Sequence, residues 1–154
     1  MMKKIIVLIF SMVLLLTIGT GCGKSEMKID KESLESLKED KLFNLFTDKY
    51  KECIPITCKK GDVTNDGLED LIIIYKSGEN IRMRVLIDGK EVIFTEEVPA
   101  PIENQTIEFK DIDNKNEVEF IVKGSKRSNI GYAIYRIENN EIKDLFGEGM
   151  NECC

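Results

Sequence analysis

The residues best suited to chemistry in this chain of 154 residues are its cysteines. Cys153 and Cys154 are adjacent, and neighbouring thiolates offer two soft donors to one ion. The pair therefore predicts a site for a thiophilic metal or a mercury-like organometal. Acidic groups beside it, such as Glu152, raise thiol pKa values by disfavouring the thiolate. That effect weakens a nucleophilic role more than a metal site, because a bound ion displaces the thiol protons itself.

Two further cysteines, Cys53 and Cys58, flank a four-residue segment that contains Pro55. We favour a structural bridge between them, or two buried thiols, at the junction of helix and sheet. A bridge requires Cα atoms within about 7 Å, so Pro55 would have to lie in a turn. The alternative makes them the resolving partners of Cys153 and Cys154, which allows thiol exchange or a four-thiolate metal site.

Oxygen-bearing side chains form a second candidate site in residues 61–70, which read GDVTNDGLED. Their spacing, with a glycine at the sixth position and a backbone carbonyl at the seventh, is typical of a loop that wraps a hard cation such as calcium. The predicted ligands are Asp62, Thr64, Asp66, Leu68 through its carbonyl, and Asp70. The alternative is a metal-free turn whose aspartates cap backbone amides, and Thr64 in place of an acidic ligand favours it. A bound ion would brace the following strand rather than catalyse a reaction.

A degraded copy of this loop begins 49 residues later, at Asp111, and reads DIDNKNEVE. Lys115 replaces the central aspartate, so we expect this copy to bind nothing. Two copies at one period predict two related blade-like sheets, each entered through such a loop. Two blades cannot close a ring, but they can pack face to face as an open sandwich.

Composition excludes several classes of function. The chain has no histidine, which excludes histidine-based acid–base catalysis, Ser-His or Cys-His nucleophile pairs and histidine-ligated metals. Its formal net charge of −6 argues against nucleic acid as a partner. We predict no catalytic residue and a protein that is not an enzyme.

The N-terminal residues 1–21 have the pattern of an export signal. Lys3 and Lys4 precede an apolar stretch that is shorter than the roughly 20 residues needed to span a bilayer. Small residues then lead to Cys22, the predicted site of lipid attachment. The alternative is an uncleaved anchor, and in either case the body of the protein lies outside the cytoplasm, tethered to the outer face of the cytoplasmic membrane.

The rest of the chain predicts a mainly β (α+β) domain. Apolar residues at helical spacing predict one amphipathic helix over residues 31–50. Short β-branched runs separated by turn residues then predict an antiparallel meander of about seven strands. These strands are expected at 71–75, 81–87, 91–95, 106–109, 118–122, 132–137 and 142–146. The expected layout is signal 1–21, tether 22–30, helix plus blade-like domain 31–147, and a mobile tail 148–154.

Three groups of residues carry a family resemblance. The residues before Cys22 resemble the lipobox of bacterial lipoproteins, and the loop at Asp62 resembles FG-GAP and VCBS-like calcium loops. Together with the pair Cys153 and Cys154, they make the chain similar to the Cys-Cys-COOH (seleno)protein SaoC family. The resemblance implies an accessory lipoprotein in an organometal system, with an ABC transporter or efflux components as partners.

Three functions follow in order of preference. The first is a tethered protein that binds or hands over a thiophilic metal or organometal through Cys153 and Cys154. The second is a non-catalytic blade-type interaction module braced by calcium and disulfides. Thiol–disulfide exchange ranks third, because the chain lacks the Cys-x-x-Cys motif of thioredoxin-like proteins.

Overall fold

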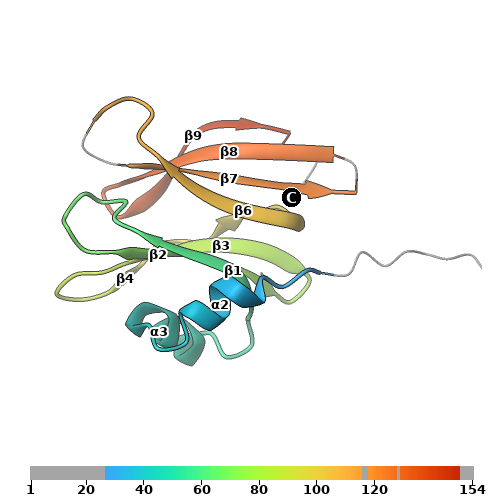
Figure 1. The fold of residues 1–154 in the computed structure, drawn as a ribbon, viewed down its shortest axis with the longest axis horizontal. Coiled ribbons are helices and arrows are strands. Elements are labelled where there is room, and N and C mark those ends of the chain that lie inside the picture. The colour runs from blue at the N-terminus through green and yellow to red at the C-terminus, as the bar shows by residue number, and fades with distance from the viewer. Residues whose placement is uncertain (1–26, 116–117, 128, 150–154) are drawn as a thin grey trace, which may run out of the picture.

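The computed structural model describes residues 27–115, 118–127 and 129–149, and it has a mainly β fold. Two antiparallel sheets stack on each other, and two short helices cover the far side of the first sheet (Figure 1). The prediction of a mainly β domain is confirmed at this level. The predictions for the signal 1–21, for Cys22 and for Cys153 and Cys154 lie outside the described residues.

Two helices replace the single helix predicted over residues 31–50. They are α2 (Lys31–Ser36) and α3 (Lys41–Lys49). Asp40 causes the break, because its Oδ1 accepts hydrogen bonds from the amides of Leu42 at 2.8 Å and Phe43 at 3.1 Å, which begins a new helix. Asp30 caps α2 in the same way, and its own amide donates to the Ile56 carbonyl at 2.8 Å. Asp30, the last residue of the predicted tether 22–30, therefore attaches the start of α2 to the first sheet.

The first sheet contains five strands, of which the sequence predicted three. Its core order is β1-β2-β3-β4, and β5 also pairs with β3. The strands are β1 (Ile54–Gly61), β2 (Asp70–Ser77), β3 (Asn80–Ile87), β4 (Ile93–Phe94) and β5 (Val98–Pro99). The predicted strand 91–95 is thus only two residues long. Strand β1 was missed because Pro55 and a polar Lys-Lys-Gly end disguise its apolar pattern.

The second sheet is a four-stranded meander in the order β6-β7-β8-β9. Its strands are β6 (Glu103–Lys110), β7 (Glu119–Lys126), β8 (Asn129–Glu138) and β9 (Glu141–Glu148). Asn139 and Asn140 join β8 to β9 with φ angles of 52° and 64°, the left-handed conformation of a tight hairpin. The described chain therefore has nine strands rather than seven.

The two sheets share one spacing along the chain. Strands β6, β7 and β8 begin 49 residues after β1, β2 and β3, respectively, and β6 and β7 also end at that distance from their counterparts. The strand pairing is also the same, since each sheet runs as an antiparallel meander from its first strand.

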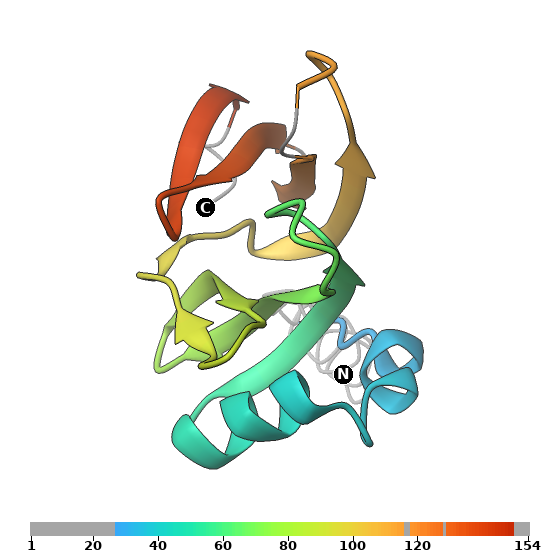
Figure 2. The same ribbon diagram turned by 90° about the vertical axis from the view of Figure 1, so that its left-hand side faces the viewer.

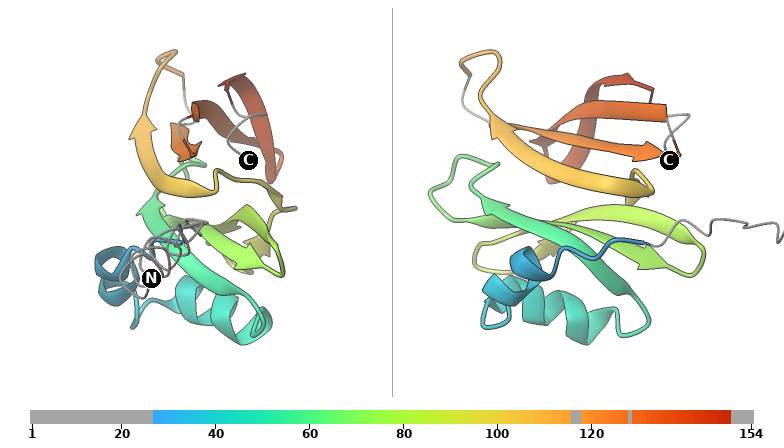
Figure 3. Two further views of the ribbon diagram at one scale, coloured as in Figure 1. Left: turned by 90° about the vertical axis from the view of Figure 1, so that its right-hand side faces the viewer. Right: turned by 45° about the vertical axis from the view of Figure 1, so that its right-hand side comes forward.

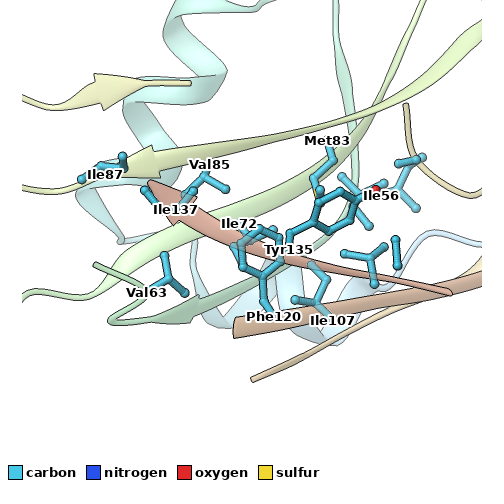
Figure 4. Close-up of a cluster of buried hydrophobic side chains, with 14 residues drawn as sticks. Ile56, Val63, Ile72, Met83, Val85, Ile87, Ile107, Phe120, Tyr135 and Ile137 are labelled. Carbon is cyan, nitrogen blue, oxygen red and sulfur yellow. The ribbon is translucent and has the colours of Figure 1, made fainter. Parts of the chain in front are cut away.

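The main core lies between the sheets. Ile72 and Val85 of the first sheet face Phe120, Tyr135 and Ile137 of the second (Figure 4). All five side chains are at most 5% exposed, so this interface is closely packed and shielded from solvent.

A second cluster covers the opposite face of the first sheet. Leu42 and Phe46 of α3 are buried against this face, which presents Leu71, Ile73 and Tyr75 from β2. The helices, the first sheet and the second sheet therefore form three layers (Figure 2). Within the described residues, no helix is long and apolar enough to cross a membrane.

Candidate metal and thiol sites

The loop between β1 and β2 contains the predicted calcium ligands, and its carboxylates bind backbone amides. Asp62 accepts hydrogen bonds from the amides of Asp66 at 3.1 Å and Gly67 at 2.9 Å. Asp66 in turn accepts from the amide of Leu68 at 2.8 Å. These are the bonds of an Asx-type turn, which is the metal-free alternative considered from the sequence.

Asp70 is the exception in this loop, because it is completely buried at the start of β2. Its two oxygens accept from the amides of Val63 at 3.1 Å and Asp88 at 3.0 Å, and from the Thr64 hydroxyl at 3.3 Å. All three donors are neutral, and no side-chain cation of the described residues lies within ion-pair distance of Asp70. Burial raises the pKa of Asp70 despite these hydrogen bonds.

The loop between β6 and β7 has the same hydrogen bond from a loop amide to a buried carboxylate. Here an arginine side chain also binds the carboxylate. Glu119 stands 49 residues after Asp70, and it accepts from the amide of Ile112 at 2.8 Å as Asp70 does from Val63. Glu119 also binds Arg136, whose Nε donates to Oε1 at 2.8 Å and whose second guanidinium nitrogen lies closer still. The amide of Ile112 and the Arg136 guanidinium outweigh burial, which alone would raise the pKa of Glu119, and they lower it.

Asp113 completes this second cluster. It binds Lys115 at 2.9 Å and Arg136 at 2.5 Å. The Lys115 ammonium, followed by the Arg136 guanidinium, lowers the pKa of Asp113 to about 2. The carboxylates of Asp111, Asp113 and Glu119 lie within 4.8 Å of one another, the only such group of three among the described residues.

The two loops therefore differ from what their sequences predict. The loop with the better calcium motif does not bring Asp62, Asp66 and Asp70 together in this structure, whereas the degraded copy gathers three carboxylates. The gathered carboxylates already face Arg136 and Lys115. Sequence reasoning missed Arg136 because it is 17 residues from Glu119 and meets it only through the pairing of β7 with β8.

The described cysteines are both free thiols. Cys58 on β1 is 4% exposed, and its Sγ lies 3.8 Å from the Ser33 carbonyl, to which it donates. Burial raises the pKa of Cys58 to about 11, so this thiol is protonated at neutral pH. Cys53 is partly exposed and packs at the edge of the helix-covered cluster.

The predicted bridge between Cys53 and Cys58 does not form in this structure. Pro55 lies within β1 and not in a turn, although a register shift interrupts the strand between Pro55 and Thr57. Cys53 comes directly before β1 and Cys58 is the fifth residue of that strand. Five residues of extended chain span roughly 16 Å, far beyond the roughly 7 Å that a disulfide allows. The alternative of two buried thiols at the junction of helix and sheet holds for Cys58, which is buried, but not for Cys53, which is partly exposed.

Comparisons of the chain with protein-family models, with curated proteins and with solved structures found no match.

Proposed function

We propose that this chain is a membrane-tethered, non-catalytic protein whose adjacent cysteines Cys153 and Cys154 bind a thiophilic metal or organometal. The observation that carries the proposal concerns the other thiols. Cys58 is buried with a raised pKa, and Cys53 lies before the start of β1, five residues of extended chain away from it. The domain therefore offers no competing two-thiolate site, and the adjacent pair is the arrangement in which two soft donors reach one ion.

The tether and the partners belong to the same proposal. Lipid attachment at Cys22 would hold the domain on the outer face of the cytoplasmic membrane. An ABC transporter or efflux component would then deliver or remove the captured species. Both ideas rest on the sequence and on the resemblance described above.

An organomercurial titration tests the metal site. Reduced full chain is titrated with phenylmercuric acetate in excess 2-mercaptoethanol, which competes with isolated thiols such as Cys53, alongside Cys153→Ser/Cys154→Ser and the matched control Cys53→Ser/Cys58→Ser. We expect the terminal double variant to lose the tight binding phase and to unfold at the same urea concentration as the parent chain. The control variant should keep that phase. If the variant without Cys153 and Cys154 kept tight binding and unfolded at a lower urea concentration than the parent chain, the pair would be a structural cross-link and not a metal site.

A specific observation favours a second candidate, a blade-type module braced by calcium at the first loop. Asp70 is a buried carboxylate that pairs with no cation of the described residues, whereas its counterpart Glu119 is neutralised by Arg136. The shared 49-residue spacing supports an interpretation of the two sheets as related blade-like repeats, of which the second carries its own cation. Calcium that bound only the folded state would stabilise it by mass action.

Thermal unfolding with and without millimolar calcium tests this candidate. We expect calcium to raise the melting temperature of the parent chain and to leave Asp66→Ala unchanged. Asp113→Ala, in the second loop, is the matched control and should still respond. A melting temperature that calcium does not move in any of the three proteins would leave the metal-free turn as the native state of the loop.

A further inference from the structure

We infer that two copies of this chain pair through the outer face of the second sheet. This outer face is the side of β7, β8 and β9 that points away from the first sheet, and its central row is Ile121, Ile134 and Phe146, which are cross-strand neighbours. The inference does not depend on metal binding.

The second sheet packs on the first through the face that is equivalent to the helix-covered face of the first sheet. Its other face, the outer face, is therefore left without a covering sheet or helix. Ile72 and Val85 lie on the face of the first sheet that the second sheet covers. The residues 49 positions later, Ile121 and Ile134, lie on the outer face, because their neighbours Phe120 and Tyr135 point into the core. No described helix or strand lies beyond that face, and the loop 111–115 reaches over one end of it, where Asp113 binds Arg136 (Figure 3). The second sheet thus presents apolar residues at positions that the first sheet buries.

The same contrast extends to the surrounding residues. Val63 of the first loop is completely buried between the sheets, whereas its counterpart Ile112 is 43% exposed. Ile81 packs against the core, whereas its counterpart Ile130 is 80% exposed. Ile130 and Phe146, which is 49% exposed, therefore add exposed apolar side chains to the row of Ile121 and Ile134, and exposed apolar surface of this kind marks an interaction site.

We expect the second copy to contact this outer face with its own outer face. The reason lies on the other side of the molecule, at the first sheet. A head-to-tail arrangement would need the covered face of the first sheet, but Leu42 and Phe46 of α3 already occupy it. A pairing of outer face with outer face is symmetric and closes after two copies. It also keeps the aligned packing that two stacked sheets prefer.

The charges on the outer face suit such a pairing. Lys143 lies on one side of the apolar row, beside Arg136, and Glu148 lies on the other side, beside Tyr132. A two-fold axis along the row would place Lys143 of each copy against Glu148 of the other. The whole chain has a net charge of −6, but in this arrangement a positive side chain of each copy would lie opposite a negative side chain of the other.

The size of the face sets the expected strength. Three strands of eight residues cover about 400 Å² per copy, or about 800 Å² in total. That area is below the size of a standard specific interface, so the dimer should be weak and should dissociate reversibly on dilution. Tethering of both copies to one membrane would favour it.

Sedimentation equilibrium of the full chain, in density-matched detergent with reductant, tests the inference. We expect a monomer–dimer equilibrium that Phe146→Lys weakens at least tenfold. The matched control is Ile54→Lys, because Ile54 is equally exposed, at 47%, but lies on β1 of the first sheet. This control should dimerise like the parent chain.

Exchanging the charges of Lys143 and Glu148 tests the two-fold arrangement of the dimer. Lys143→Glu alone should weaken the dimer, and Lys143→Glu combined with Glu148→Lys should restore it. A chain that stays monomeric at 100 μM, or a dimer that Phe146→Lys leaves intact, would overturn the inference. A dimer weakened by Phe146→Lys but not restored by the charge exchange would overturn the two-fold arrangement.

Discussion

Arg136 is the residue that most distinguishes the two halves of the molecule. Its side chain is 10% exposed and binds both Glu119 and Asp113, while the equivalent position in the first sheet is Ile87. A guanidinium can satisfy two carboxylates at once and is always charged. The second loop therefore has an internal counter-ion, and the first loop has a buried Asp70 that depends on neutral donors.

Replacing Arg136 with Met should make stability depend on pH in a defined direction. The pKa of Glu119 is lowered in the folded protein, so its stabilising contribution is present above the unfolded pKa of about 4.3 and is lost as the pH falls. We expect the gap in melting temperature between the parent chain and Arg136→Met to be large at pH 7 and smaller at pH 3, where Asp113, with a pKa of about 2, still keeps its share of the ion pair. Arg82→Met removes a longer, more exposed ion pair with Glu97 and should show a small gap at both pH values.

The thiols should differ in reactivity in the folded protein. Cys58 has a pKa of about 11 through burial, and only its thiolate reacts with iodoacetamide. We expect Cys53 to be alkylated well before Cys58 at pH 8, and equal labelling of the two in urea. Peptide mass spectrometry measures both, and equally fast labelling of the folded chain would contradict the buried position of Cys58.

At the scale of elements, the helices were misjudged for a local reason that the sequence nevertheless contains. The apolar spacing over residues 31–50 is continuous enough to suggest one helix, but Asp40 accepts two amide hydrogen bonds and starts α3. Helix caps compete with helix continuation, and periodicity alone does not register them. Strand β1 was hidden by Pro55 and its polar end, and β5 is too short to leave a pattern.

Substituting Asp40 with Ala should cost about 1 to 2 kcal/mol of unfolding free energy, since Asp40 caps α3. It also removes the 2.8 Å ion pair between Asp40 and Lys60 of β1. Asp48→Ala is the matched control, because Asp48 is an exposed residue of the same helix. Urea unfolding at pH 7 measures the difference, and equal midpoints for the two variants would contradict the capping role.

At the scale of the whole molecule, the loop positions and most strands could be predicted, but the stacking direction and the ion pair of Arg136 could not. Turn residues and loop motifs are local, so the sequence marks them directly. Which face of each sheet is covered depends on how two sheets pack. The alternation of residues such as Phe120 and Ile121 is apolar on both faces and does not distinguish them.

The junction between the sheets should be sensitive to one added methyl group. A Cβ at Gly124 of β7 would lie 2.2 Å from the Cβ of Pro101 and 2.8 Å from the Glu103 carbonyl oxygen. We expect Gly124→Ala to lower stability by about 1 to 3 kcal/mol, the range for overpacked sites. Gly89→Ala, whose nearest atom would be 3.5 Å away, should change little in the same melting experiment.

The meander order has a consequence for how the chain folds. Strands bond only to strands nearby in the chain, and the longest connection between bonded strands, from β3 to β5, is residues 88–97. Short loops cost little entropy to close, so each sheet can form from local hairpins before the two sheets meet. We expect hydrogen exchange during refolding to protect the β2–β3 and β7–β8 hairpins first, and burial of Tyr135 against the first sheet to follow as a later, separate step.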